Sequence, residues 1–167
     1  MCIMIERIKH GQWKRLRDLR LRALSESPKA FMSTLESASQ RSPESWAKQT
    51  DASVSGSERI TLLASQDGAM IGIAALYHMN NKPEDWGELL QVWVDPDFRR
   101  MSVAAQMIQK IHSWAYNNQY RVIIATVHIE NPGAIRFYKK LGYETDSIET
   151  AQSPPRDHVL RYELKES

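Results

Sequence analysis

The sequence holds a single cysteine, Cys2, so it can form neither an intrachain disulfide nor a cysteine-rich metal site. Its histidines show no ligand spacing, and we expect no metal. No apolar run approaches the roughly 20 residues of a membrane-spanning helix, and the first residues lack the apolar stretch of a signal peptide. These absences predict a cytoplasmic protein with no membrane partner.

An excess of one charge is lacking as well. Lys and Arg number 22 and Asp and Glu 20, which gives a net charge of +2, and no long basic stripe is present. Nucleic acid is therefore not expected as a partner. The composition, 42% apolar and 25% charged, is ordinary for a globular protein, and 167 residues suit one compact core. We expect a single domain over residues 1–167.

The front of the chain, residues 1–59, is predicted to be helical. Apolar residues recur at helical spacing from Gln12 to Leu24, and Ser42-Pro43-Glu44 is typical of the start of a second helix. Basic residues alternate with the apolar ones of the first helix, and we interpret this charge run as a solvated face. Its members are Lys14, Arg15, Arg17, Arg20 and Arg22.

Strand patterns dominate the rest of the chain. Two apolar runs joined by Gln66-Asp67-Gly68 predict a hairpin, and Glu88–Val94 is apolar on both faces, which favours a central strand. A helix with an apolar face follows that strand. The expected elements are strands at residues 60–64, 69–77, 88–94, 122–129 and 159–164, a helix from about 103 to 115, and a loop at 146–157. This order predicts a mixed α/β layer structure.

The run from Asn131 to Tyr143 is the most informative one. Asn131 and Pro132 are typical of an N-cap and a first helical residue, and Gly142 suits a helix end, so a short helix is predicted. Tyr138 lies on the apolar stripe of that helix. From the residues alone it is either a buried tyrosine with a satisfied hydroxyl or a functional group.

A second junction, residues 96–105, joins the central strand to the next helix. Free backbone N–H groups at the helix start favour an anion, and Arg99 and Arg100 could add charge-assisted hydrogen bonds. The alternative is an ordinary loop with solvated arginines in which Ser102 caps the helix. The residues alone leave both interpretations open.

Together these two runs resemble the GNAT superfamily of acyl-CoA-dependent N-acetyltransferases. The loop Arg99-Arg100-Met101-Ser102-Val103-Ala104 is similar to the family's Arg/Gln-x-x-Gly-x-Gly/Ala motif, and the later block matches at Asn131, Ala134, Phe137-Tyr138 and Leu141-Gly142-Tyr143. The resemblance implies a GNAT-like single domain with a central mixed, largely antiparallel sheet of about six to seven strands. About four helices would flank this sheet, which would be splayed at the cofactor site. Residues 1–59 would be the acceptor-side segment, and residues 60–164 the sheet and acetyl-CoA-binding core.

The resemblance also implies roles for individual residues. Backbone amides from Arg100 to Ala104 would cradle the pyrophosphate of acetyl-CoA, and the Val92 and Val94 backbones would pair with its pantetheine arm. Asn131 would help to hold that arm, and Tyr138 would protonate the leaving thiolate. The implied cofactor-binding set is Val92, Val94, Arg99, Arg100, Met101, Ser102, Val103, Ala104, Asn131, Ala134, Phe137 and Tyr138.

The chain departs from the family pattern where Ser102 replaces a glycine and Arg100 stands in place of a small residue. If the backbone at Ser102 needs a positive φ, a non-glycine residue there costs roughly 1 kcal/mol. The alternative is that the Ser102 hydroxyl and the Arg100 charge both serve the phosphates.

No single residue identifies the general base. Glu88, at the start of the central strand, is the first candidate, because a carboxylate there could take the amine proton directly or through water. The alternative for Glu88 is an exposed charge. His128 and Glu130 are further candidates, whereas Thr126, which stands where some relatives carry a glutamate, cannot act as a base.

We predict that the enzyme acetylates a small-molecule amine, amino-acid-like in character, by direct attack on acetyl-CoA. An apolar wall and an acidic set could receive a protonated amine. The wall would comprise Phe31, Met32, Trp46 and Trp86, and the acidic set Glu84, Asp85, Asp146 and Glu149. Protein or peptide N-acetylation is an alternative, and so is a catalytically weak acyl-CoA-binding regulatory module. Exposed tryptophans leave room for a homodimer.

Overall fold

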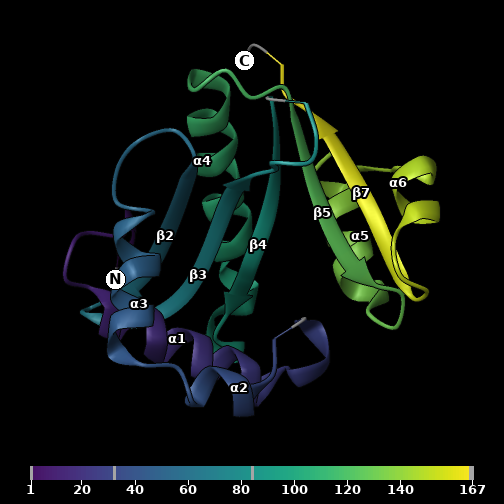
Figure 1. Ribbon diagram of the computed structural model, residues 1–167. Coiled ribbons are helices and arrows are strands. Elements are labelled where there is room, and N and C mark those ends of the chain that lie inside the picture. The colour runs from purple at the N-terminus through teal and green to yellow at the C-terminus, as the bar shows by residue number, and fades with distance from the viewer. Residues whose placement is uncertain (1, 32, 84, 166–167) are drawn as a thin grey trace. The chain divides into compact units, whose positions relative to one another are not determined.

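The computed structural model describes residues 2–31, 33–83 and 85–165 (Figure 1). Over these residues the hydrogen-bonded strands follow the order β1-β2-β3-β4-β5-β7-β6 in a seven-stranded sheet. The predicted mixed α/β sheet is thereby confirmed. The chain divides into two compact units, the first running to Tyr77 and including Leu90–Ile111, the second comprising His78–Leu89 and the chain from His112 onward. Strand β4 and helix α4 each contribute to both units.

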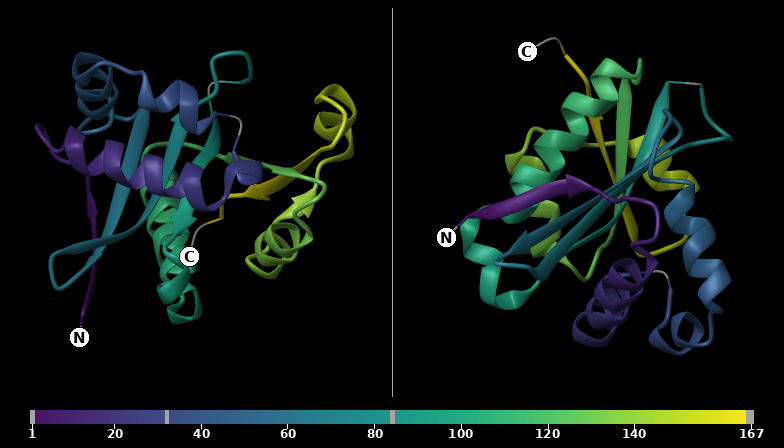
Figure 2. Two further views of the ribbon diagram at one scale, coloured as in Figure 1. Left: turned by 90° about the horizontal axis from the view of Figure 1, so that it is seen from below. Right: turned by 90° about the vertical axis from the view of Figure 1, so that its left-hand side faces the viewer.

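In the first unit, helices cover both faces of the strands. Helices α1 and α3 lie on one face and the first half of α4 on the other (Figure 2). The elements of this unit are β1 (Ile3–Arg7), α1 (Trp13–Glu26), the 3-10 helix η1 (Pro28–Ala30), α2 (Leu35–Ser39), α3 (Pro43–Asp51), β2 (Arg59–Gln66), β3 (Ala69–His78), the second half of β4 (Trp86–Val94), the 3-10 helix η2 (Pro96–Met101) and the first half of α4 (Val103–Asn117).

The core of the first unit follows from the helical spacing of α1. This helix buries an apolar stripe against side chains of β2, β3 and β4. The stripe is Leu16, Leu19, Ala23 and Leu24, and its sheet partners include Leu63, Ile73 and Trp93. Each such large side chain stabilises the fold by roughly 1.5–3 kcal/mol. On the other face, a Cβ on Gly72 would lie 3.2 Å from the Cε of Met107, so the absence of a side chain lets α4 approach β3 closely.

The predicted hairpin is confirmed, whereas the prediction that residues 1–59 are helical is wrong at its start. Asp67 and Gly68, with φ of 51° and 85°, form the turn between β2 and β3, as the Asp-Gly pair predicts. Residues Ile3–Arg7 form β1, which pairs antiparallel with β2. The physical reason is the two-residue period of Ile3 and Ile5, a strand pattern too short to stand out beside the helical stripe that follows.

In the second unit, helices α5 and α6 lie on opposite faces of the β5–β7 strands (Figure 2). β4 pairs parallel with β5 from Trp86 to Leu89, and β5 pairs antiparallel with β7. The elements are the first half of β4, the second half of α4, β5 (Val122–His128), α5 (Pro132–Lys140), β6 (Glu144–Thr145), α6 (Ser147–Gln152) and β7 (Asp157–Glu163).

Helix α6 and strand β6 were not anticipated. The segment from Asp146 to Asp157 was predicted to be a loop, but Asp146 accepts a hydrogen bond from the Glu149 backbone N–H at 2.9 Å and so caps a helical turn and a half. The described residues thus hold six α-helices where about four were expected. None of the helices described is long and apolar enough to cross a membrane.

Candidate functional site

The turn into α4 in the first unit has an unusual backbone. The 3-10 helix η2 ends at Met101, and Ser102 then adopts the left-handed conformation with φ 60° and ψ 23° before α4 begins at Val103. The positive φ considered from the sequence is therefore present. Because the first N–H groups of an α-helix have no intrahelical acceptor, this turn presents backbone donors and the positive end of a helix dipole. Such a turn is suited to hold an anion.

Arg99 and Arg100 differ in what they bind within the protein. Arg99 donates from Nε to the Val94 carbonyl at 2.9 Å and from Nη2 to Glu26 Oε2 at 2.7 Å. Arg100 is exposed and makes no hydrogen bond or ion pair with any described residue. Arg99 therefore links the end of β4 to α1. Of the two arginines predicted to bind an anion, Arg100 is the one whose charge is not paired with a described residue.

Glu26 is a residue of this region that the sequence analysis missed. Its carboxylate accepts hydrogen bonds from Arg99 and from Trp93 Nε1, the latter at 2.9 Å. Partial burial works to raise its pKa, but hydrogen bonds from Arg99, Ser27 and Trp93 outweigh this effect and hold the pKa at about 2. Glu26 is thus ionised at neutral pH. No local signal could have found it, because 73 residues separate it from Arg99.

Strand β4 carries a backbone irregularity just before Val92. Gln91 has a φ of 60°, and its buried Oε1 has no hydrogen-bond partner among the described residues. A strand residue seldom adopts this conformation, so Gln91 kinks β4. Val92 is half-buried and Val94 is buried. Pairing of their backbones with the pantetheine arm stays a prediction.

Glu88 lies on β4 within the second unit, opposite Ile124 of β5 in the strand register. Its side chain is half-buried, and burial raises its pKa above the ordinary value of a carboxyl group. The interpretation of Glu88 as an exposed charge at a strand start is therefore excluded. A carboxyl group whose pKa is raised binds a proton more readily than an ordinary one.

Tyr138 is on α5 and is 7% exposed. Its ring contacts those of Phe137 and Tyr143, each at 5.3 Å between centroids, and burial raises its pKa above the ordinary value of 10. Its hydroxyl donates to none of the residues that the structure describes. The sequence allowed either a buried tyrosine with a hydrogen-bonded hydroxyl or a functional group. The ring is buried as the first interpretation requires, but its hydroxyl has no acceptor among the described residues.

Asn131 performs the predicted capping of α5. Its Oδ1 accepts a hydrogen bond from the Ala134 backbone N–H at 3.2 Å, which commits the amide oxygen and leaves the NH₂ group as the donor for a ligand. The two other candidate bases of this unit, His128 and Glu130, already have hydrogen-bond or ion-pair partners within the protein. His128 Nδ1 accepts from the Glu130 backbone N–H at 3.2 Å, and Glu130 is paired with Arg156 at 3.3 Å.

The predicted acidic set does not form an uncompensated charge. Each described member is already ion-paired within the second unit. Asp85 lies 3.7 Å from Arg121, Asp146 lies 3.7 Å from Arg161, and Glu149 lies 2.6 Å from Lys82. Glu84 lies outside the described residues. Attraction of a protonated amine by this set is therefore weak, because each carboxylate is neutralised by a neighbour.

The predicted apolar wall is wrong for Trp46. This side chain is 2% exposed and belongs to the core of the first unit, so it cannot line an open surface. Phe31 is half-buried in the same unit. Trp86 in the second unit is also half-buried, and the cationic groups of Lys82 and Arg161 lie 5.8 and 5.0 Å from its ring centroid. Met32 lies outside the described residues.

The interpretation of the α1 charge run as a solvated face is wrong for Arg20. Arg20 is 5% exposed, whereas Lys14 and Arg15 are exposed as expected. Position 20 falls on the buried stripe, since it follows Leu16 by four residues and precedes Leu24 by four. The helical spacing therefore indicates that position 20 is buried, whereas the charge of arginine suggested that it is exposed.

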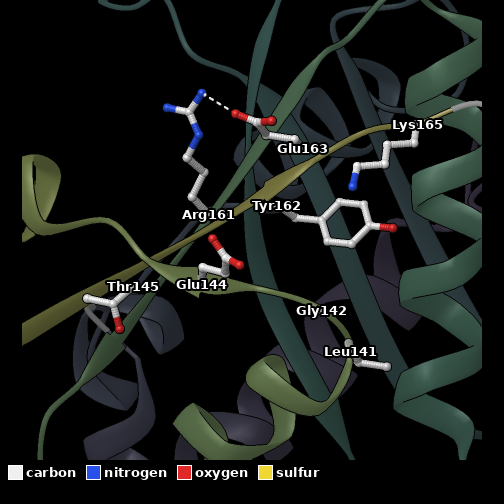
Figure 3. A pocket seen from close by; sticks show the side chains of 8 residues that line it. All are labelled: Leu141, Gly142, Glu144, Thr145, Arg161, Tyr162, Glu163 and Lys165. Atoms are coloured by element: carbon white, nitrogen blue, oxygen red, sulfur yellow. Dashed lines mark hydrogen bonds and ion pairs between the residues drawn. The ribbon is translucent and has the colours of Figure 1, made fainter.

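A polar pocket of about 370 Å³ opens in the second unit at the end of β7 (Figure 3). Arg161 and Glu163 of its lining are joined by an ion pair of 3.0 Å, and Tyr162 points to the other side of the strand. The lining residues are Leu141, Gly142, Glu144, Thr145, Arg161, Tyr162, Glu163 and Lys165. None of the predicted site residues lines this pocket. Within the described chain, no three His, Cys, Asp or Glu residues gather as a metal site would require.

Comparison with known proteins identifies relatives of one kind. The model of the acetyltransferase (GNAT) family matches residues 13–143. An uncharacterized N-acetyltransferase of Methanocaldococcus jannaschii is 35% identical over 69 residues, which cover 41% of this chain and only 30% of that protein. The chain thus matches less than a third of the length of this curated relative.

Solved structures share the fold. The acetyltransferase of the GNAT family from Streptococcus pneumoniae matches with a TM-score of 0.80 and 16% identity, over 98% of this chain and 100% of that one. The PaiA N-acetyltransferase from Thermoplasma acidophilum, solved in complex with coenzyme A, matches with a TM-score of 0.72 and 14% identity, over 98% and 99% of the two chains. At these identities the likeness concerns the fold.

Proposed function

The chain belongs to the acetyltransferase (GNAT) family, and from this premise we propose that it transfers an acetyl group from acetyl-CoA to a primary amine. The observation that carries the proposal is the turn into α4, where left-handed Ser102 precedes a helix start whose N–H groups have no intrahelical acceptor. A backbone turn of this kind is suited to the diphosphate of coenzyme A.

Residues of the first unit would bind the cosubstrate. Backbone N–H groups from Arg100 to Ala104 would donate to phosphate oxygens, and Arg100 would add a charge that no described residue neutralises. The positive φ of Gln91 supports recognition of an extended arm by the β4 backbone at Val92 and Val94, because a residue in this conformation interrupts the regular strand. When bound, acetyl-CoA supplies a thioester whose carbonyl carbon an amine can attack.

Residues of the second unit would move protons. Glu88 would accept the proton that the amine loses as the N–C bond forms, and its raised pKa makes it a better proton acceptor than an ordinary carboxylate. Tyr138 would donate a hydrogen bond to the sulfur that leaves as the C–S bond breaks. Because burial raises the pKa of Tyr138 above 10 and an ordinary thiol has a pKa near 8.5, complete proton transfer to the thiolate is uphill. Its contribution is therefore a hydrogen bond that stabilises the developing negative charge.

The acceptor would be a small amine or an amino-acid-like molecule. The half-buried Phe31 and the buried cation Arg20 of the first unit favour a small ligand with defined polar groups over a flat protein surface. Acetylation of a peptide N-terminus or of a lysine side chain is the competing outcome of the test below.

The test measures free coenzyme A released by purified protein from acetyl-CoA with a panel of amines, amino acids and peptides. Tyr138→Phe should lower kcat about 10²-fold with a small change in KM for acetyl-CoA, because the lost hydrogen bond acts in the transition state. Tyr116→Phe is the matched control, since Tyr116 is an exposed tyrosine of the same unit. Release that stays at the background rate for every acceptor would refute the proposal, and an unchanged kcat in Tyr138→Phe would remove Tyr138 from it.

A further inference from the structure

Arg20 is a buried cation without a counter-charge. The residue is 5% exposed, and its Nη1 is fully buried without a hydrogen bond. Among the residues that the structure describes, Arg20 makes no ion pair, although six other arginines pair with carboxylates. Its guanidinium stands over the Phe31 ring, whose centroid lies 4.9 Å away.

The surroundings of Arg20 add positive charge. Burial lowers the pKa of Arg20, and of the ionisable neighbours that act on it, Tyr77 raises the pKa and Arg41 lowers it further. Arg41 is stacked at 3.8 Å on Trp46 and donates to Ser45, and no described carboxylate pairs with it. Arg59 stands over the Tyr77 ring at 4.2 Å. No carboxylate is among the charged groups that act on Arg20 or Arg41.

Burying a guanidinium without an anion is costly, because the protein supplies neither the water nor the counter-charge that the group loses on folding. The neighbours of Arg20 are not sealed off: Phe31, Arg41 and Tyr77 are each half-buried. A ligand of Arg20 would have to approach from the side of these three residues. Its anionic group would complete the cluster.

We propose that Arg20, with Arg41 beside it, binds a carboxylate of the acceptor, so that the substrates are primary amines that carry a carboxylate. This inference rests on the proposed acetyl transfer and names the class of its acceptor. A planar guanidinium presents paired donors that match the two oxygens of a carboxylate. Tyr77 contributes a hydroxyl to the same cluster, since it accepts from Gln49 Nε2 at 3.1 Å and keeps its proton to donate.

A phosphate of the cosubstrate is the other anion that this enzyme would meet. The observations favour a carboxylate, because the phosphate-binding turn at Ser102 has its own free cation in Arg100. The neighbouring basic residue of α1, Arg22, is also committed, as it pairs with Asp95 at 2.5 Å. Arg20 lies on the opposite, buried side of the helix.

The first experiment compares matched acceptors. Initial rates, corrected for the fraction of unprotonated amine, are measured for amino acids and for their carboxamides, which lack the negative charge of the carboxylate. The wild type should prefer the acid at least tenfold in kcat/KM, and Arg20→Gln should raise KM for the acids at least tenfold and abolish the preference. Arg15→Gln, an exposed arginine of the same helix, should keep it. If Arg20→Gln does not fold, Arg41→Gln carries the same test. Equal rates for acids and amides in the wild type would overturn the inference and leave the proposed transfer intact.

The second experiment does not depend on turnover. Calorimetry measures binding of N-acetylglycine, N-acetylglycinamide and inorganic phosphate to the wild type and to Arg20→Gln. Binding of N-acetylglycine alone, weakened at least tenfold in Arg20→Gln, would support the carboxylate site even if no amine is acetylated. Tighter binding of phosphate than of N-acetylglycine, or binding that Arg20→Gln leaves unchanged, would overturn it.

Stability separates a binding role from a structural one. Arg20→Met replaces an uncompensated buried charge by an apolar side chain of similar length, so the unliganded variant should melt at least as high as the wild type. N-acetylglycine should raise the melting temperature of the wild type only. A large fall in the melting temperature of Arg20→Met would assign Arg20 to the core and contradict the proposal.

Discussion

Replacing Ser102 by glycine tests whether the turn into α4 is strained. Ser102 has φ 60° and ψ 23°, a left-handed conformation that costs an L-residue roughly 1–2 kcal/mol and glycine almost nothing. Glycine also loses more backbone entropy on folding than serine, which lowers the stabilisation from relieved strain by about 0.4–1 kcal/mol. The net expectation for Ser102→Gly is a stabilisation of about 0.5–1 kcal/mol.

In a domain of this size such a change corresponds to a rise in Tm of roughly 1–4 °C. Thermal unfolding followed by circular dichroism measures it, and calorimetry with coenzyme A measures the affinity of the turn. Gln119→Gly is the matched control, because Gln119 is exposed and has a φ of 72° in the second unit. Both variants should gain stability, and only Ser102→Gly should alter the affinity for coenzyme A.

The opposite substitution sharpens the test. Ser102→Val introduces a β-branched side chain into a conformation that such residues avoid, and should lower both Tm and the affinity for coenzyme A. The strain argument is refuted if Ser102→Gly melts below the wild type while Gln119→Gly melts above it. In that case the Ser102 hydroxyl contributes more to the turn than its backbone conformation costs.

Three further changes probe the second unit. Glu88→Gln should lower kcat about 10²-fold and flatten the rise of kcat with pH, because the raised pKa of Glu88 belongs to the group that accepts the proton; an unaltered pH profile would exclude it as the base. Burial lowers the pKa of His112 to about 4, so the unfolded chain takes up this proton first as the pH falls. Stability should therefore be lost between pH 6.5 and pH 4, by up to roughly 3 kcal/mol in urea titrations, and His112→Gln should remove most of that slope. Glu149→Gln leaves half-buried Lys82 unpaired and should speed amide hydrogen exchange in α6 but not in α5, whereas equal exchange would show that the ion pair does not hold α6.

Local chemistry explains why much of the fold could be predicted. The Asn131 cap, the Asp67-Gly68 turn and the apolar stripe of α1 each act within a few residues, so the sequence pattern and the structure have the same cause. The same holds for the turn at Ser102, where the family pattern predicted glycine and the structure shows the positive φ that glycine serves. Short elements escaped, because a five-residue strand and a six-residue helix carry little periodicity.

Tertiary contacts decided the chemical state of single side chains. Arg99 and Arg100 are adjacent and of one type, yet Arg99 is neutralised by Glu26 from a distant part of the chain and Arg100 is not. Trp46 was predicted to line the acceptor site. It lies instead in the core of the first unit, because α3 packs against α1. Helical spacing constrains which face a residue occupies, but not what stands opposite that face.

The sequence by itself determined the family, the two motif-bearing turns and the identity of Tyr138 as the residue to test, because these depend on spacing along the chain. Only the tertiary structure decided that, among the described residues, the Tyr138 hydroxyl has no acceptor and Arg20 has no acid, and that Glu88 is half-buried. The reason is physical. Protonation and binding depend on which groups surround a side chain in space, and these groups come from helices and strands far apart in the sequence.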